Sequence, residues 1–237
     1  MNVSVDQLRK LEQDAKHVLS ELTSHHAPVV AEFAGSPKAG KSTTIDILTH
    51  FFKRVGYKVW APTEGASKRT PYHLKSDLVA FNTWTLNYAI SELLVAYNNV
   101  DHHHLIFLDR GPFDSMAWMR VLQKESKHEL TEDELEVHRA YAMHPRWSDL
   151  ITRIYLFDCE PAVSLQREHE SKLISLPGTA MNEPMLRALL HQYEHLASDL
   201  VNYPLHTVTT SDETTPLSTS YELAVDLMRE LRKRVGE

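Results

Sequence analysis

Residues 35–42, GSPKAGKS, have the composition and spacing of a phosphate-binding loop, G-x-x-x-x-G-K-[ST]. In such a loop, backbone N–H groups and the positive end of the following helix receive a β-phosphate. Lys41 is then expected to bridge the β- and γ-phosphates, and Ser42 to offer its hydroxyl to Mg²⁺. A glycine-rich turn that holds no ligand is the alternative. The residues expected to bind the nucleotide are Gly35, Ser36, Pro37, Lys38, Ala39, Gly40, Lys41, Ser42 and Thr43.

A carboxylate and an arginine follow the short apolar segment LIFLD, which reads as a strand ending in Asp109. An acidic residue in this place reaches the magnesium ion directly or through water, so Ser42 and Asp109 are the predicted metal ligands. The alternative for Asp109 is a helix cap. Arg110 comes next, and its guanidinium is suited either to bind phosphate or acceptor oxygens or to pair with Glu64 or Asp114.

The elements that must position these residues alternate between strand-like and helix-like patterns. Short apolar segments predict five strands, at residues 28–34, 57–62, 105–109, 151–158 and 205–209. Helices are expected between them and after the last strand, including long ones at about 74–98, 183–202 and 218–234. This alternation predicts a three-layer α/β/α fold with a five-stranded parallel sheet. Ligands bind to such sheets at the carboxyl ends of the strands, where the loop and Asp109 fall.

An amphipathic helix is predicted before the first strand, over residues 4–24, opened by a capping box of Ser4 and Gln7. The expected organisation is therefore an N-terminal helix in residues 1–27 and one domain in residues 28–237. No internal repeat or low-complexity linker interrupts the second part.

Composition narrows the classes of protein. Hydrophobic residues make up 42% of the 237 residues and charged residues 24%, as in ordinary globular domains. The N-terminus is polar and the sequence has no long apolar run. These two features predict a cytoplasmic protein without a membrane segment or signal peptide. One cysteine, Cys159, suits a reducing compartment. A net charge of -7 argues against nucleic acid as a partner. The 15 histidines lack the spacing of a zinc site, so no structural zinc is expected.

The phosphate-binding loop, the Asp-Arg-Gly after the third strand and a later charged segment together resemble the P-loop nucleoside and nucleotide kinases, over residues 28–210. The thymidylate kinase and deoxynucleoside kinase group is most similar. The chain also resembles nicotinamide-riboside-kinase-like ATPases, in DRGPFDSMAW after the strand and in FNTWT before it. The resemblance implies a P-loop NTPase fold of the nucleoside and nucleotide kinase type. No N-K-x-D guanine motif occurs, which favours ATP as the phosphate donor.

The resemblance also assigns roles to single residues. Glu64, in APTEG after the second strand, takes the position of the base that accepts the proton of the acceptor hydroxyl. Arg167 takes the position of a lid arginine, in a lid segment at about 167–181, with Lys172 as a substitute for a second lid cation. The base of the donor would lie near residues 210–212. The acceptor pocket would be formed by Phe81, Asn82, Trp84, Thr85, Tyr88, Phe113 and Trp118.

Three functions follow. The first is a Mg²⁺-dependent ATP phosphotransferase acting on a hydroxyl of a small nucleoside-like acceptor, with Lys41, Glu64, Asp109, Arg110 and Arg167 as catalytic residues. The second is a nucleoside monophosphate kinase that grips the acceptor phosphate with Arg69 and Arg110. The third is a nucleotide-binding ATPase switch, regulated by a protein partner that docks on the N-terminal helix. The expected partner is a small nucleoside or nucleotide, with no nucleic acid and no membrane, and a homodimer is left open.

Overall fold

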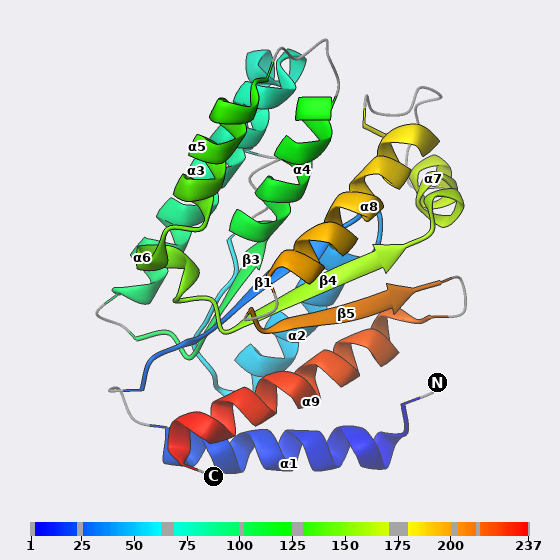
Figure 1. Ribbon diagram of the computed structural model, residues 1–237. Helices are drawn as coiled ribbons and strands as arrows, with labels where there is room; N and C mark the ends of the chain where they lie inside the picture. The colour runs from blue at the N-terminus through cyan, green and yellow to red at the C-terminus, as the bar shows by residue number, and fades with distance from the viewer. Residues whose placement is uncertain are drawn as a thin grey trace.

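A computed structural model describes residues 3–22, 26–62, 69–99, 102–124, 130–170, 180–200, 203–211 and 214–236. Figure 1 shows a central sheet between two layers of helices, with one layer above the sheet and the other below it in this view. The predicted three-layer α/β/α fold is confirmed, and its sheet has five parallel strands.

The strands lie in the order β2-β3-β1-β4-β5. Their bounds are β1 Val29–Gly35, β2 Val59–Trp60, β3 Leu105–Asp109, β4 Arg153–Cys159 and β5 Leu205–Thr210. The central strand β1 is buried along its whole length because helices cover both of its faces. Its register with β3 sets Phe33 opposite Asp109, and its register with β4 sets Gly35 opposite Phe157.

Two separate apolar clusters lie on the two faces of the sheet. Alternate residues of β1 divide between them, with Ala31 and Phe33 in one cluster and Val30 and Ala34 in the other. The first cluster lies under α1 Val5–Glu21, α2 Lys41–Val55 and α9 Pro216–Val235. The second lies under α3 Leu78–Tyr97, α4 Pro112–Lys124 and α8 Glu183–Asp199. The other helical elements are η2 Tyr72–Ser76, α5 Glu132–Ala142, α6 Pro145–Ser148 and α7 Pro161–Glu170.

The long helix predicted at about 74–98 divides in two. A short 3-10 helix, η2, precedes α3, which begins only at Leu78. The Asp77 side chain is the reason, because its carboxylate accepts hydrogen bonds from the backbone N–H groups of Val79 and Ala80, both at 3.0 Å. The N-terminal helix does form with the predicted capping box of Ser4 and Gln7.

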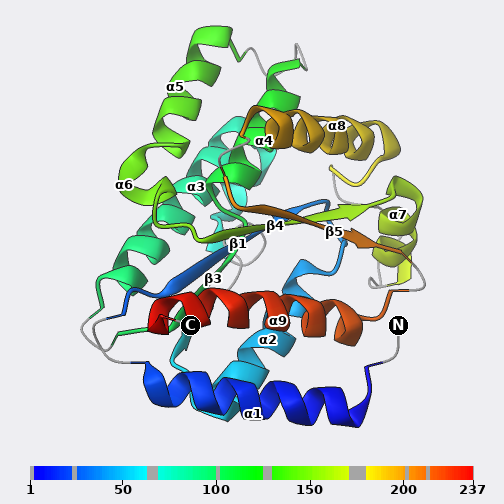
Figure 2. The same ribbon diagram turned by 60° about the horizontal axis from the view of Figure 1, so that its bottom comes forward.

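Helix α1 packs into the layer formed by α2 and α9, along the bottom of Figure 2. Its side chains Leu11, Ala15 and Val18 are buried and belong to the same apolar cluster as the sheet. The hydroxyl of Tyr57 donates a hydrogen bond to the carbonyl oxygen of Ala15 at 2.8 Å. The apolar face of α1 is therefore covered by its own chain.

Because α1 shares the core, truncating its buried side chain should destabilise the whole fold. We expect Val18→Ala to lower the free energy of unfolding by about 2 kcal/mol. Val5→Ala makes the same chemical change in the same helix where the side chain is 63% exposed. It should change the free energy of unfolding by less than about 0.5 kcal/mol. Urea unfolding followed by circular dichroism measures both, and equal effects would show that α1 is not part of the cooperative unit.

Candidate functional site

The loop between β1 and α2 has the conformation of a phosphate-binding loop. Gly40 is in the left-handed region and precedes α2 without any side-chain cap at the start of that helix. Gly35 has a φ of 123°, and a Cβ there would lie 2.2 Å from the carbonyl oxygen of Phe157. The Lys41 amine donates hydrogen bonds to the carbonyl oxygens of Gly35 and Ser36, at 2.9 and 2.7 Å. The loop thus curves around a buried ammonium group.

Ser42 and Asp109, the two predicted metal ligands, come together. The Ser42 hydroxyl donates a hydrogen bond of 2.6 Å to the Asp109 carboxylate. They meet because β1 and β3 are neighbours in the sheet, so the end of β3 lies beside the loop that leaves β1. A hydroxyl and a carboxylate are hard oxygen donors of the kind that Mg²⁺ prefers, so the pair fits that ion.

Arg110 pairs with Asp114, one of the two carboxylates considered from the sequence. Its Nη1 donates to Asp114 Oδ2 at 2.7 Å, and its guanidinium carbon lies 5.8 Å from the centre of the Trp118 ring. The backbone at Arg110 has a φ of 70°, in the left-handed region, and its N–H donates to the carbonyl oxygen of Phe33. A non-glycine residue held in this region is typical of a constrained functional turn.

Asp114 joins three parts of the site, and the sequence did not indicate this role. Its side chain is buried at the start of α4. Oδ1 accepts a hydrogen bond from the backbone N–H of Gly35 at 3.0 Å and another from the hydroxyl of Tyr193 on α8. Burial and the adjacent Asp114 carboxylate raise the pKa of Tyr193 well above its ordinary value, so the phenol remains a donor.

Glu32 is a second residue of the site that the sequence analysis missed. It lies in β1, fully buried, and its carboxylate accepts from the backbone N–H groups of Phe113 and Asp114 at 3.3 and 2.8 Å. Burial raises the pKa of Glu32 to about 8, although these N–H groups favour the charged form. The carboxyl also packs on Gly111, where a Cβ would approach it to 2.8 Å. The sequence did carry a signal for this residue, because Glu32 is an ionisable residue inside the apolar segment VVAEFA.

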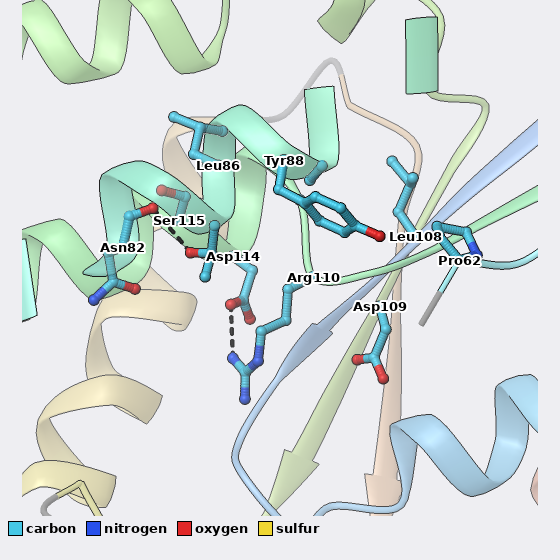
Figure 3. A pocket seen from close by; sticks show the side chains of 12 residues that line it. Pro62, Asn82, Leu86, Tyr88, Leu108, Asp109, Arg110, Asp114 and Ser115 are labelled. Carbon is cyan, nitrogen blue, oxygen red and sulfur yellow. Dashed lines mark hydrogen bonds and ion pairs between the residues drawn. The ribbon is translucent and has the colours of Figure 1, made fainter. Parts of the chain in front are cut away.

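A pocket opens between α3 and α4 at the end of β3, and we call it the α3–α4 pocket (Figure 3). Its cavity volume is about 20 Å³. Its walls come from α3, the end of β3 and the start of α4, with one residue after β2: Pro62, Asn82, Thr85, Leu86, Tyr88, Ala89, Leu108, Asp109, Arg110, Gly111, Asp114 and Ser115.

Only part of the predicted acceptor set lines this pocket. Asn82, Thr85 and Tyr88 do, and Trp84 stacks on Tyr88 with 5.5 Å between ring centres. Phe113 is instead buried in the core against Tyr193. Aromatic residues at helical spacing either line a pocket or pack in the core, so the spacing alone does not distinguish pocket residues from core residues.

The pocket wall also holds a buried polar pair that the sequence did not suggest. Ser115 Oγ lies 3.0 Å from Nε2 of His138, which comes from α5. Burial lowers the pKa of His138 to about 4, so its imidazole is neutral near neutral pH.

A second pocket, the β5-side pocket, lies on the other side of the phosphate-binding loop. Its cavity volume is about 280 Å³, and it is lined by Lys38, Ala39, Gly40, Thr43, Thr44, Phe157, Arg167, Thr210, Thr214, Pro216 and Thr219. Thr210 falls in the region expected for the base of the donor.

Arg167 borders the β5-side pocket. Its guanidinium donates to the carbonyl oxygens of Lys38 and Ser211 at 3.3 and 2.9 Å, so it links α7 to the loop and to the end of β5. Lys38 pairs with Glu168 of the same helix at 3.2 Å.

Several expected residues lie outside the part of the chain that the structure describes. They are Glu64, Lys172 and most of the lid segment, residues 171–179. Among the described residues, no group of three or more His, Cys, Asp or Glu side chains is placed to hold a metal ion. Within the same residues, no helix is long and apolar enough to cross a membrane.

Comparisons with known proteins bear on the fold. Residues 30–147 match the family model AAA_28, described as an AAA domain. Two structures of deoxyadenosine kinase from M. mycoides, with bound dCTP and with bound dATP, match with a TM-score of 0.58 at 16% identity. A third, with the products dCMP and a flexible dCDP bound, has a TM-score of 0.60 at 18% identity. Each match covers 85% of this chain and 100% of the other. No curated protein matches the sequence.

The chain has a P-loop nucleoside and nucleotide kinase-like fold. The resemblance given by the loop and the Asp-Arg-Gly motif is confirmed at the level of fold, because the matched kinase structures superpose on 85% of this chain with TM-scores of 0.58 to 0.60.

The raised pKa of Glu32 predicts how stability depends on pH. The pKa of Glu32 in the folded protein, about 8, exceeds the ordinary glutamate pKa of about 4.5, so folding favours the protonated form. Its stabilising contribution is complete below about 4.5 and is lost as the pH rises towards 8, by up to about 1.4 kcal/mol per pH unit. In Glu32→Gln this slope should disappear. Urea midpoints at pH 5, 6, 7 and 8 measure it.

The Gln amide in Glu32→Gln also changes the hydrogen bonds to α4, which shifts the stability at every pH. The variants are therefore compared by the slope of stability against pH. Glu21→Gln, at an exposed position of α1, should keep the wild-type slope. A slope in Glu32→Gln as steep as in the wild type would contradict the assignment.

Proposed function

We propose that the protein is a Mg²⁺-dependent phosphotransferase that moves the γ-phosphoryl group of ATP to a hydroxyl of a small nucleoside-like acceptor. The observation that carries the proposal is the 2.6 Å hydrogen bond between Ser42 and Asp109. Asp109 also lines the α3–α4 pocket, so the expected metal site lies at the boundary between the donor loop and a pocket for a second molecule. The matched kinase structures with dATP and dCTP support a nucleotide ligand.

The donor side of the site is built for phosphate. Lys41 is held by two loop carbonyls, and its ammonium group would bind phosphate oxygens as it does in other P-loops. Gly40 leaves the start of α2 without a side-chain cap, so the N–H groups of its first turn can bind an anion. Ser42 and Asp109 would hold Mg²⁺. When bound, MgATP supplies the phosphoryl group and a divalent charge that neutralises the transferring oxygens.

The β5-side pocket is the place for the base of the donor. It adjoins the loop at Gly40 and Thr43, and Thr210 and Pro216 form its far wall. Arg167 lies against the loop here. We propose that it compensates charge on the donor phosphates while it fixes the loop at Lys38.

The acceptor would occupy the α3–α4 pocket. Asn82 and Ser115 offer polar groups there, and Tyr88 offers an aromatic wall. Glu64 remains our proposal for the base that takes the proton of the acceptor hydroxyl. It follows β2 by a few residues, and Pro62, two residues before it, borders the pocket.

A nucleoside monophosphate kinase is the second candidate. Burial raises the pKa of Tyr88, and nearby Arg69 partly offsets the rise, which indicates a cation close to the pocket. Arg110, the other cation that a phosphate acceptor would need, is already paired with Asp114 at 2.7 Å. The partner-regulated switch has less support, because the apolar face of α1 is buried in its own chain.

Turnover tests the proposed reaction. ADP release from MgATP should rise with one or more members of a panel of nucleosides, nucleoside monophosphates and nicotinamide riboside. It should stop when EDTA removes the metal. Lys41→Ala should lower the acceptor-dependent rate by at least about 100-fold, because it removes the cation at the phosphates. Lys53→Ala, at an exposed position of the same helix, should leave the rate unchanged. Nucleotide binding without acceptor-dependent release would favour the switch.

The role of Glu64 has its own test. Glu64→Gln should lower kcat with the preferred nucleoside by about 100-fold or more, since a hydroxyl needs a base. Its effect on phosphoryl transfer to a monophosphate should be much smaller, because a phosphate oxygen carries no proton that must leave. Glu136→Gln, at an exposed position of α5, is the matched control. A kcat for the nucleoside within threefold of wild type would remove Glu64 from the mechanism.

A further inference from the structure

Asp114 contacts both the donor loop and the acceptor-side arginine. It lies in the first turn of α4 with only 2% of its surface exposed. Its Oδ1 accepts from the backbone N–H of Gly35 and from the Tyr193 hydroxyl, while its Oδ2 accepts from Arg110. Both oxygens are therefore engaged, and each faces a different part of the site.

On the donor side, the contact fixes the first peptide of the loop. The Gly35 backbone packs closely on β4, because a Cβ there would lie 2.2 Å from the carbonyl oxygen of Phe157. Its N–H points to Asp114 rather than into the loop. Tyr193 on α8 donates a hydrogen bond from its hydroxyl to the Asp114 carboxylate and so keeps that carboxylate in place.

On the acceptor side, the contact occupies Arg110. The guanidinium is held between the Asp114 carboxylate and the Trp118 ring, and the left-handed backbone at Arg110 fixes where its side chain starts. Figure 3 shows the guanidinium and the Asp114 carboxylate turned towards each other, while Asp109 points away from them. An acceptor phosphate would have to compete with a buried carboxylate for this arginine.

The charges around the pocket act in the same direction. The charged side chains among the described residues that line it are Asp109, Arg110 and Asp114, so two carboxylates and one cation form its wall, while Arg69, which acts on Tyr88, does not line it. A phosphate monoester brings a further negative charge into this environment. A neutral or cationic nucleoside does not incur that repulsion.

We propose that Asp114 is a specificity-determining positioning residue. By keeping Arg110 engaged, it makes the α3–α4 pocket select an acceptor without a phosphate group, while it holds the Gly35 peptide of the donor loop. The inference rests on the proposed function and deepens it, because it separates nucleosides from nucleoside monophosphates as acceptors.

The test compares binding of deoxycytidine and its 5′-monophosphate, measured by calorimetry with saturating ADP on the donor loop. The wild type should bind the nucleoside more tightly. Asp114→Asn keeps the shape of the side chain but removes its negative charge, which weakens its hold on the guanidinium. The ratio of the two affinities should then move towards the monophosphate by on the order of tenfold.

Asp199→Asn is the matched control. Asp199 on α8 also pairs with an arginine of α4, Arg120, at 3.2 Å, and the substitution changes the net charge by the same amount. Its affinity ratio should stay at the wild-type value. A merely structural effect of Asp114→Asn would weaken both ligands together and leave the ratio unchanged, so the ratio distinguishes the two.

Arg110→Gln keeps the inference testable if Asp114→Asn does not fold. Because Arg110 is already occupied in the wild type, its removal should change the monophosphate affinity by less than about threefold. A tenfold loss, or tighter binding of the monophosphate than of the nucleoside by the wild type, would overturn the inference. Nucleoside turnover with an unchanged ratio in Asp114→Asn would overturn it and leave the proposed function intact. Binding of neither probe, with no acceptor-dependent turnover, would overturn both.

Discussion

The parallel pairing of β1 with β3 is the constraint on which the site depends. The register places Asp109 beside Phe33, just before the phosphate-binding loop leaves the sheet. Ser42, in the first turn of the helix after the loop, then meets the Asp109 carboxylate. Because strand side chains alternate between faces, a slip of one residue would turn Asp109 to the other face and separate the pair. The backbone ladder therefore determines the geometry of the expected metal site.

The buried carboxyl groups of Glu32 and Asp114 connect the acceptor side to β1. Burying a carboxylate costs free energy unless hydrogen bonds compensate for the lost water. Glu32 of β1 accepts from the N–H groups at the start of α4, and Asp114 of α4 returns a contact to the N–H of Gly35 at the end of β1. Each of the two elements, β1 and α4, thus contributes a side chain that accepts a hydrogen bond from the backbone of the other. The turn that carries Arg110 lies between these contacts and is fixed by them.

The two sides of the loop differ in charge, which is consistent with different ligands. The donor side carries two cations, Lys41 inside the loop and Arg167 at its edge. Both donate hydrogen bonds to loop carbonyl oxygens, so their charged groups lie close to where phosphates would bind. On the acceptor side the cation Arg110 faces a carboxylate at short distance. Electrostatics of this kind favours a polyphosphate on one side and a ligand with little negative charge on the other.

The sequence by itself determined the alternation of strands and helices, the loop of residues 35–42 before a helix, and the placement of Ser42 and Asp109 at one edge of the sheet. These follow from local patterns, since spacing defines a loop and parallel topology brings strand ends to one edge. The tertiary structure decided the partner of Arg110, the burial of Phe113 and the roles of Glu32 and Asp114. Their positions depend on which helix packs on which face, and the distances along the chain, such as 79 residues between Gly35 and Asp114, carry no local signal. Hydrogen bonds between such distant residues form only when the fold brings a buried donor to a buried acceptor.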